Sequence, residues 1–195
     1  MKVCKQFYIF RRSLVAILFI LCAHNVSAAY MSLNLGYDRF VNSSLNENNA
    51  SFAGPGANIG VGFNIAKIPI EVNFGQSKLN GIVNHDGQER SIDSTLTNFA
   101  LRALIPLTKR FYFSAGYVKS TAEFSFDEDS KFTEAGIRDT YELADEEITG
   151  FSYGAGFSLN RNTKRQFYIE YNLINFTENS SNLSSLIIGY RHKIN

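Results

Sequence analysis

Hydrophobic residues recur at every second position along much of this chain. In residues 57–66 every odd position is apolar, and most even positions are asparagine or glycine. Because side chains alternate between the two faces of a β-strand, this period of two places the apolar set on one face. The opposite face carries asparagine, glycine and serine instead of the lysine and glutamate of a water-exposed sheet. The pattern is typical of a strand whose apolar face meets lipid and whose small polar residues line a narrow barrel.

The same alternation predicts eight strands. They cover residues 30–40, 57–66, 70–77, 92–105, 111–121, 149–159, 166–175 and 183–194. Most are close to the roughly 9–11 residues that a tilted strand needs to cross a bilayer. An even number of strands is also what single-chain bacterial barrels require. The sequence therefore predicts an all-β fold, an eight-stranded antiparallel transmembrane β-barrel with up-and-down meander connectivity.

The predicted connections alternate between long and short. The long ones are residues 41–56, 78–91, 122–148 and 176–182, and the short ones are residues 67–69, 106–110 and 160–165. Bacterial barrels have short periplasmic turns and longer loops outside the cell. We therefore expect both termini in the periplasm and four loops on the cell surface.

The first 28 residues have the features of a secretory signal peptide. Four basic residues and no acidic one accompany an apolar run at residues 14–23, and small residues end at Ala28. The run is shorter than the roughly 20 residues of a spanning helix, which disfavours the alternative of an uncleaved anchor. We expect cleavage after Ala28 or one residue later, which leaves a barrel domain over residues 29–195.

Cysteine and charge exclude several classes of function. Both cysteines, Cys4 and Cys22, lie in the leader, and Leu21 is not the small residue that a lipoprotein signal needs before its cysteine. The mature chain therefore has no disulfide, no thiolate metal site and no cysteine nucleophile. Of the 19 lysines and arginines, four lie in the leader, so 15 face 18 acidic residues and the mature net charge is −3. No basic stripe remains for nucleic acid.

Aromatic residues gather near both ends of the predicted outward faces. The chain has no tryptophan, so tyrosine and phenylalanine must form any interfacial girdle. Near the short turns these are Phe111, Phe113, Phe157 and Phe167, and toward the long loops they are Tyr37, Phe74, Tyr117, Phe151 and Tyr171. Outward positions at both ends favour a girdle over ordinary core packing.

Charged residues are predicted inside the barrel. An eight-stranded barrel is just wide enough for its own side chains to fill. The charged residues predicted to face inward are Asp38, Glu71, Arg102, Glu170, Arg191 and Lys193. Unpaired charges in a narrow lumen are costly, so we expect ion pairs, with Glu71–Arg102 and Glu170–Arg191 on neighbouring strands. This favours a lumen plugged by side chains over a gated ion path.

An acidic segment and two histidines are the candidates for metal binding or catalysis. Residues 127–147 are strongly acidic but lack the spacing and glycine of an EF-hand, so we expect a mobile negative tip with Phe132, Ile137 and Tyr141 as contact residues. The histidines after the leader, His85 and His192, match no nucleophile–base arrangement. We predict no catalytic residue, no metal ligand and no cofactor. A lipid A-modifying enzyme is the less favoured alternative.

At this point the chain resembles the small eight-stranded outer-membrane β-barrel family, the OmpA/OmpX-like and opacity-protein-like porin group. The resemblance covers the mature chain and rests on the leader, the eight alternating segments, the connection lengths and the closing residues 186–191. It implies the bacterial outer membrane, contact with lipid and lipopolysaccharide, and insertion by the barrel-assembly machinery. Such barrels usually end on an aromatic residue, whereas Ile194 stands one place from the end here, which bears on the efficiency of assembly.

A plugged barrel leaves its loops as the sites of recognition, because loops on a rigid scaffold usually carry binding. We therefore expect a surface protein that acts in adhesion or in host or envelope interaction through residues 41–56, 78–91, 122–148 and 176–182. An envelope-structural barrel and a narrow ion channel are the alternatives.

Overall fold

The computed structural model describes residues 29–43, 49–65, 68–127, 131, 133–141, 143–160, 164–177 and 181–194. The predicted signal peptide, with its cleavage point at Ala28, lies outside these residues, and so does Phe132.

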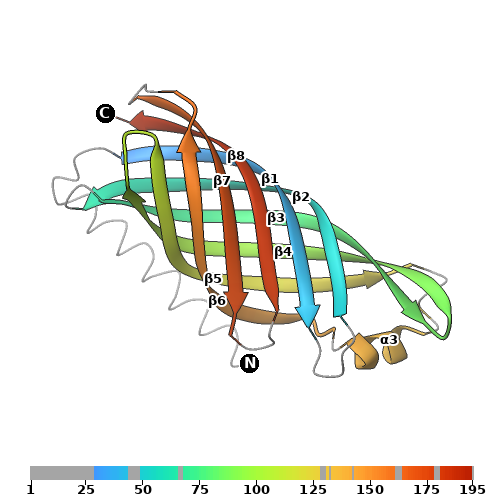
Figure 1. Ribbon diagram of the computed structural model, residues 1–195. Helices are drawn as coiled ribbons and strands as arrows, with labels where there is room; N and C mark the ends of the chain where they lie inside the picture. The colour runs from blue at the N-terminus through green and yellow to red at the C-terminus, as the bar shows by residue number, and fades with distance from the viewer. Residues whose placement is uncertain are drawn as a thin grey trace.

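Eight antiparallel strands form a closed barrel, as the alternation predicted (Figure 1). They are β1 (Ala29–Ser43), β2 (Asn49–Ile65), β3 (Ile68–His85), β4 (Gln88–Pro106), β5 (Phe111–Phe126), β6 (Glu146–Ser158), β7 (Arg165–Phe176) and β8 (Asn182–Ile194). Each strand pairs with the next, and β1 pairs with β8 from Ala29 opposite Ile194 to Val41 opposite Asn182. This closure lets backbone N–H and C=O groups pair around the ring, as a lipid environment requires.

The end of the barrel where β1 begins and β8 ends is called the terminus end. The opposite end, where the helix α3 (Glu134–Tyr141) lies, is called the α3 end (Figure 1). Among the described residues, no helix combines the length and the apolar character needed to cross a bilayer.

A band of exposed apolar side chains surrounds the half of the barrel nearer the terminus end. On β1 it consists of Met31, Leu33, Leu35 and Tyr37, and on the other strands it includes Ile59, Phe74, Leu101, Phe111, Phe151, Phe167, Tyr171 and Ile188. The predicted girdle residues belong to this band. Two pairs of them lie in ring contact across neighbouring strands, Phe111 with Phe157 at 4.7 Å and Tyr117 with Phe151 at 6.0 Å between ring centroids.

The strands continue past this band, so the predicted loops 41–56, 78–91 and 122–148 were wrong in their extent, whereas the predicted loop 176–182 agrees with the connection between β7 and β8. Residues 78–91 are not a loop, because β3 and β4 run through them and meet at the two-residue turn Asp86–Gly87, with φ of 54° and 74°. Positive φ at both central positions matches the type I′ turn, whose twist suits a tight hairpin. The strands β1, β2, β5 and β6 likewise extend into the segments predicted as loops 41–56 and 122–148, and β7 and β8 take the ends of 176–182.

The interior changes character along the barrel. In the half nearer the terminus end it is lined by buried polar and charged side chains, including Asn34, Glu71, Ser114 and Glu170. Toward the α3 end it is filled by an apolar cluster, called the α3-end core, whose fully buried members include Phe52, Ile92, Leu96 and Ile137. The expectation that small polar residues line the whole lumen is therefore correct for only part of its length.

The outer surface changes in the opposite sense. Beyond the apolar band, β4 presents Asp93, Thr95 and Thr97 outward while Ile92 and Leu96 point into the barrel. A strand in water buries its apolar face inside a core, whereas a strand in lipid turns that face outward. The switch therefore indicates that each long strand passes from hydrocarbon into water.

Candidate functional site

Four charged side chains meet in the lumen at the level of the apolar band. Arg102 on β4 lies 2.8 Å from Glu71 on β3 and 2.5 Å from Glu170 on β7. Arg191 on β8 lies 3.1 Å from Glu71 and 3.7 Å from Glu170. Each arginine therefore contacts both glutamates. We call these four residues the lumen charge cluster, and its net charge is zero.

Neutral polar groups complete the surroundings of both carboxylates. Asn73 donates to Glu71 at 2.8 Å. Tyr112 donates to Glu170 at 2.7 Å, and Ser114 donates to the same carboxylate at 3.1 Å. All four charged residues are buried, with both glutamates 0% exposed. Such dense hydrogen bonding offsets the large cost of removing four charges from water.

Aromatic rings fill the space next to Arg191. Its guanidinium lies 3.7 Å from the ring centroid of Tyr168 and 5.0 Å from that of Tyr112. Each tyrosine faces a glycine directly across the strand pair, Tyr168 opposite Gly189 and Tyr112 opposite Gly156. A Cβ atom at either glycine would overlap the opposing tyrosine ring. The glycines therefore provide the room in which these inward rings lie flat against the wall.

The six charged residues predicted to face inward differ in their partners and in their burial. Glu71 and Arg102 are direct cross-strand partners, but Glu170 lies opposite Ile187, and Arg191 reaches it from farther along β8. Asp38 is buried and accepts a hydrogen bond from Ser77 instead of forming an ion pair with a described residue. Lys193 has the expected inward parity but is exposed at the terminus end, where it lines the mouth of the lumen instead of forming an ion pair with a described residue. It follows the last buried position of β8, where the chain leaves the lumen.

The contacts that sequence reasoning missed are those across the lumen. Arg102 with Glu170 and Arg191 with Glu71 join strands that are not neighbours. Tyr112, Tyr168 and Asn73 also escaped notice. The alternation along each strand predicts that these residues face inward, but no local pattern shows which inward residues lie at the same height in the barrel.

The helix α3 covers the opening at the α3 end. Ile137 and Tyr141 are buried in the α3-end core, so the expectation that they form an exposed, mobile tip was wrong. Tyr141 donates to the carbonyl oxygen of Asn84 at 2.7 Å, and Asn42 donates to the carbonyl oxygen of Tyr141 at 3.1 Å. The helix is therefore fastened to both the β3–β4 hairpin and β1.

A single arginine joins α3 to β5. Arg138 donates to Glu134 at 2.9 Å and to the carbonyl oxygen of Phe124 at 3.1 Å, and it lies 3.3 Å from Asp145. Burial acts to lower the pKa of Arg138, but the hydrogen bonds that it donates to Glu134 and Asp145 outweigh this effect, so the pKa lies above its ordinary value. The acidic segment thus supplies internal partners for this helix.

Neither histidine of the described chain has the partners of a catalytic base. His85 Nε2 lies 3.6 Å from Asp86 at the hairpin turn. His192 Nδ1 lies 3.2 Å from the hydroxyl of Tyr190 on the outer surface. No contact joins either ring to a serine or threonine hydroxyl within the part of the chain that the structure describes.

A family model for the outer membrane protein beta-barrel domain matches residues 13–191. The chain belongs to this family. No curated protein matches it. The barrel is similar in fold to OprG from Pseudomonas aeruginosa, with 10% identity, a TM-score of 0.52, and coverage of 86% of this chain and 96% of that one. It is also similar to Neisserial surface protein A, with 13% identity, a TM-score of 0.51, and coverage of 85% and 97%.

A third similar structure is Ail, the attachment invasion locus protein of Yersinia pestis, in complex with the heparin analogue sucrose octasulfate. It shows 13% identity and a TM-score of 0.49 over 85% of this chain and 99% of that one.

In an outer-membrane barrel the exposed apolar band meets lipid. The lumen charge cluster therefore lies at membrane depth, and the polar-surfaced strands and α3 lie outside the bilayer.

The part outside the bilayer presents a largely polar sheet surface. Six polar side chains on the outward face of β3, β4 and β5 beyond the band are called the outer platform: Lys78, Asn80, Asp93, Thr95, Thr121 and Glu123. Ile82 on β3, which is 63% exposed, lies on the same face. Lys78 lies opposite Thr95, and Thr95 lies opposite Glu123. Asn80 donates to Asp93 at 2.8 Å. Backbone pairing beneath these side chains and the α3-end core behind them make this surface rigid.

Proposed function

We propose that this protein acts at the cell surface, where the outer platform and α3 bind a host or envelope component. The observation that carries the proposal is the reversal of polarity along the strands. A barrel that served only to occupy the membrane has no need to extend its strands beyond the lipid and fill them with a second, apolar core. The extension is an ordered scaffold for a polar surface, which is where recognition usually lies.

The orientation in the membrane is part of this proposal. The longest connection, residues 127–145 with α3, lies at the α3 end, although the β3–β4 turn there has only two residues, whereas the terminus end carries no comparably long connection and includes the four-residue turn between Pro106 and Phe111. The asymmetry typical of bacterial barrels assigns the terminus end to the periplasm and the α3 end to the outside. Processing after Ala28 and insertion by the barrel-assembly machinery are the expected route, with phospholipid and lipopolysaccharide as the surrounding lipids.

We further propose that the lumen is closed by side chains. Support comes from three successive layers: the lumen charge cluster, a polar cavity of about 50 Å³ above it, and the α3-end core. A cavity of that size holds a few water molecules, on the scale of roughly 10–15 Å³ for each. A structural or recognition role therefore fits the interior better than a narrow ion channel, and the positions of both histidines give no support to an enzyme.

Single-cysteine labelling tests the orientation. Because Cys4 and Cys22 both lie in the expected leader, the mature chain provides a cysteine-free background. A membrane-impermeant maleimide should label Lys78→Cys on intact cells. The matched variant Lys164→Cys, at the terminus end, should react only after the outer membrane is opened. The reverse result would refute the orientation.

Adhesion of bacteria that display the protein tests the recognition role. The double variant Lys78→Glu/Thr95→Arg changes the centre of the outer platform, and Lys164→Glu makes a charge reversal at the other end. If the platform contacts a host-cell ligand, the double variant should reduce binding at least about fivefold, as loss of one well-placed interface residue does. Lys164→Glu should bind like the unmodified protein. Equal binding by all three would count against platform recognition.

A further inference from the structure

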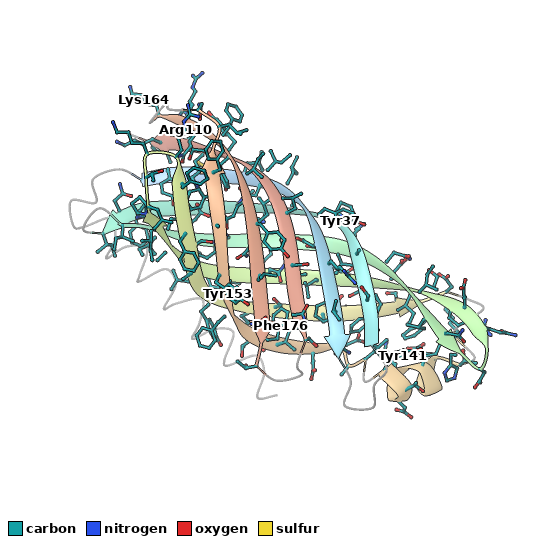
Figure 2. All side chains as sticks on the ribbon, viewed as in Figure 1. Tyr37, Arg110, Tyr141, Tyr153, Lys164 and Phe176 are labelled. Carbon is teal, nitrogen blue, oxygen red and sulfur yellow. The ribbon has the colours of Figure 1, made fainter. Side chains whose placement is uncertain are left out.

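A cavity opens at the terminus end, on the side of the lumen charge cluster away from α3. Its volume is about 330 Å³, and it lies between the β4–β5 turn and the ends of β1, β7 and β8. Thr108, Ser158 and Gln166 contribute neutral polar groups to its wall, and Tyr30 and Tyr112 contribute aromatic ones. In Figure 2, Arg110 and Lys164 lie at this end, and Tyr141 lies at the other.

The charged residues that line the cavity are all cationic. They are Lys109, Arg110, Arg191 and Lys193, and we call them the basic mouth. Among the described residues, no aspartate or glutamate lines the cavity. The sequence reinforces this, since residues 64–70, 105–112, 157–169 and 190–195 contain no acidic residue. The acidic residues that the structure describes lie in the lumen or toward the α3 end.

Three of these cations lack a carboxylate partner. Lys109, Arg110 and Lys193 form no ion pair with any described residue, whereas Arg191 is held by the lumen charge cluster. The Arg110 guanidinium lies 5.8 Å from the ring centroid of Phe157, which orients its side chain along the wall. Like charges gathered around a concave surface raise the local concentration of anions, and walls of low dielectric strengthen the effect. The arrangement is complementary to an anion and to no cation.

We propose that the basic mouth binds a phosphate group, presented either by an anionic phospholipid headgroup or by free phosphate. The planar fork of an arginine and the point charges of lysines are the groups that proteins use for phosphate. The enclosed volume admits a small anion or a headgroup. Phe111 lines the cavity and is also exposed on the outer apolar band, so the cavity reaches the edge where a lipid tail would lie.

Nuclear magnetic resonance of the folded barrel can test this proposal with two sources of phosphate. In neutral detergent micelles, inorganic phosphate is titrated at constant ionic strength. In lipid nanodiscs, a fully zwitterionic bilayer is compared with one that contains phosphatidylglycerol. Backbone amides of residues 107–112 and 191–194 should shift in a saturable manner in at least one of the two experiments. The experiment that responds identifies the source of the phosphate.

A matched pair of variants separates a site from a general positive field. Lys109→Gln/Arg110→Gln removes two cations from the basic mouth, and Lys164→Gln/Arg165→Gln removes two from the neighbouring turn of the same end. Loss of one charged hydrogen bond typically lowers affinity about tenfold, so the first variant should bind at least about tenfold more weakly. The second should keep most of its affinity.

Two results would overturn the proposal: no saturable shift with either phosphate source, or equal weakening by both double variants. Heat-modifiable electrophoretic mobility shows whether each variant is folded. If Lys109→Gln/Arg110→Gln does not fold, Lys193→Gln serves in its place, because Lys193 lies at the exposed end of β8. Failure of this site would leave the proposed surface role untouched, since that role concerns the opposite end of the barrel.

Discussion

Replacement of Arg102 by methionine is the sharpest test of the lumen charge cluster. Arg102 is 4% exposed, and its guanidinium contacts Glu71 at 2.8 Å and Glu170 at 2.5 Å. Methionine keeps much of the side-chain length but removes the charge, which leaves two buried carboxylates facing Arg191 alone. Removal of one partner from a buried ion pair typically costs about 3–5 kcal/mol. Since Arg191 remains 3.1 Å from Glu71, we expect the free energy of unfolding to fall by about 3 kcal/mol, at the low end of this range.

A second substitution tests whether the uncompensated charge causes the loss of stability. Glu170→Gln restores neutrality in the Arg102→Met background. Its amide oxygen can still accept the hydrogen bond from Tyr112, while its NH₂ group can donate to the hydroxyl of Ser114. We expect the double variant to regain about 2 kcal/mol relative to Arg102→Met, because the uncompensated charge accounts for most of the loss. Arg39→Met is the matched control, since Arg39 is exposed on the outer surface. It should cost less than about 1 kcal/mol.

Urea-dependent unfolding in lipid vesicles measures these free energies. The chain has no tryptophan, so far-ultraviolet circular dichroism and electrophoretic mobility of unheated samples are suitable readouts. Two observations would refute the reasoning. One is an Arg102→Met barrel within about 0.5 kcal/mol of the unmodified protein, the usual range for a neutral surface change. The other is a double variant whose loss equals the sum of the two single losses.

Three further substitutions test other parts of the barrel. Leu35→Lys, in the apolar band, should destabilise the barrel by about 2–4 kcal/mol in vesicles, whereas Thr95→Lys, beyond the band, should cost close to nothing; equal costs would contradict the membrane boundary. Gly189→Val should lower the urea midpoint by the equivalent of at least about 1–3 kcal/mol, because a Cβ there overlaps the Tyr168 ring; an unchanged midpoint would show that the ring moves freely. Ile137→Ser should speed amide hydrogen exchange in α3 without changing the mobility of the folded barrel, and slow exchange in the variant would mean that burial of Ile137 does not hold the helix.

The spanning part of the fold was readable from sequence because the signal is local. Lipid outside and a crowded interior impose opposite requirements on successive residues of a strand. Each segment such as residues 57–66 records this constraint independently, and eight such segments with an even count leave the up-and-down barrel as the simplest closure. The pairing of Glu71 with Arg102 followed from the same logic, because adjacent strands bring facing residues together.

The loops were mispredicted because the alternation changes phase beyond the membrane. On β3 the apolar positions are Val72 and Phe74 in the band but Leu79 and Val83 beyond it, so the apolar set moves from even to odd numbers just where the predicted strand 70–77 ended. A prediction based on one continuous alternation ends the strand at this point and treats the following residues as a loop. The phase change was itself in the sequence, and it marks the level at which the surroundings of the strand change from hydrocarbon to water.

The amino-acid sequence by itself therefore determined the strands, their faces and their passage through a membrane, because each of these depends on neighbours one or two positions away. The tertiary structure alone decided which inward charges share a level of the lumen and that α3 closes one end. It also gathered at the other end Lys109, Arg110 and Lys193, which form no ion pair with a described residue. Arg102 meets Glu170, and Arg191 meets Glu71, only because the sheet closes on itself. Closure brings together residues from distant strands, and the relative heights of those strands are set by the barrel as a whole.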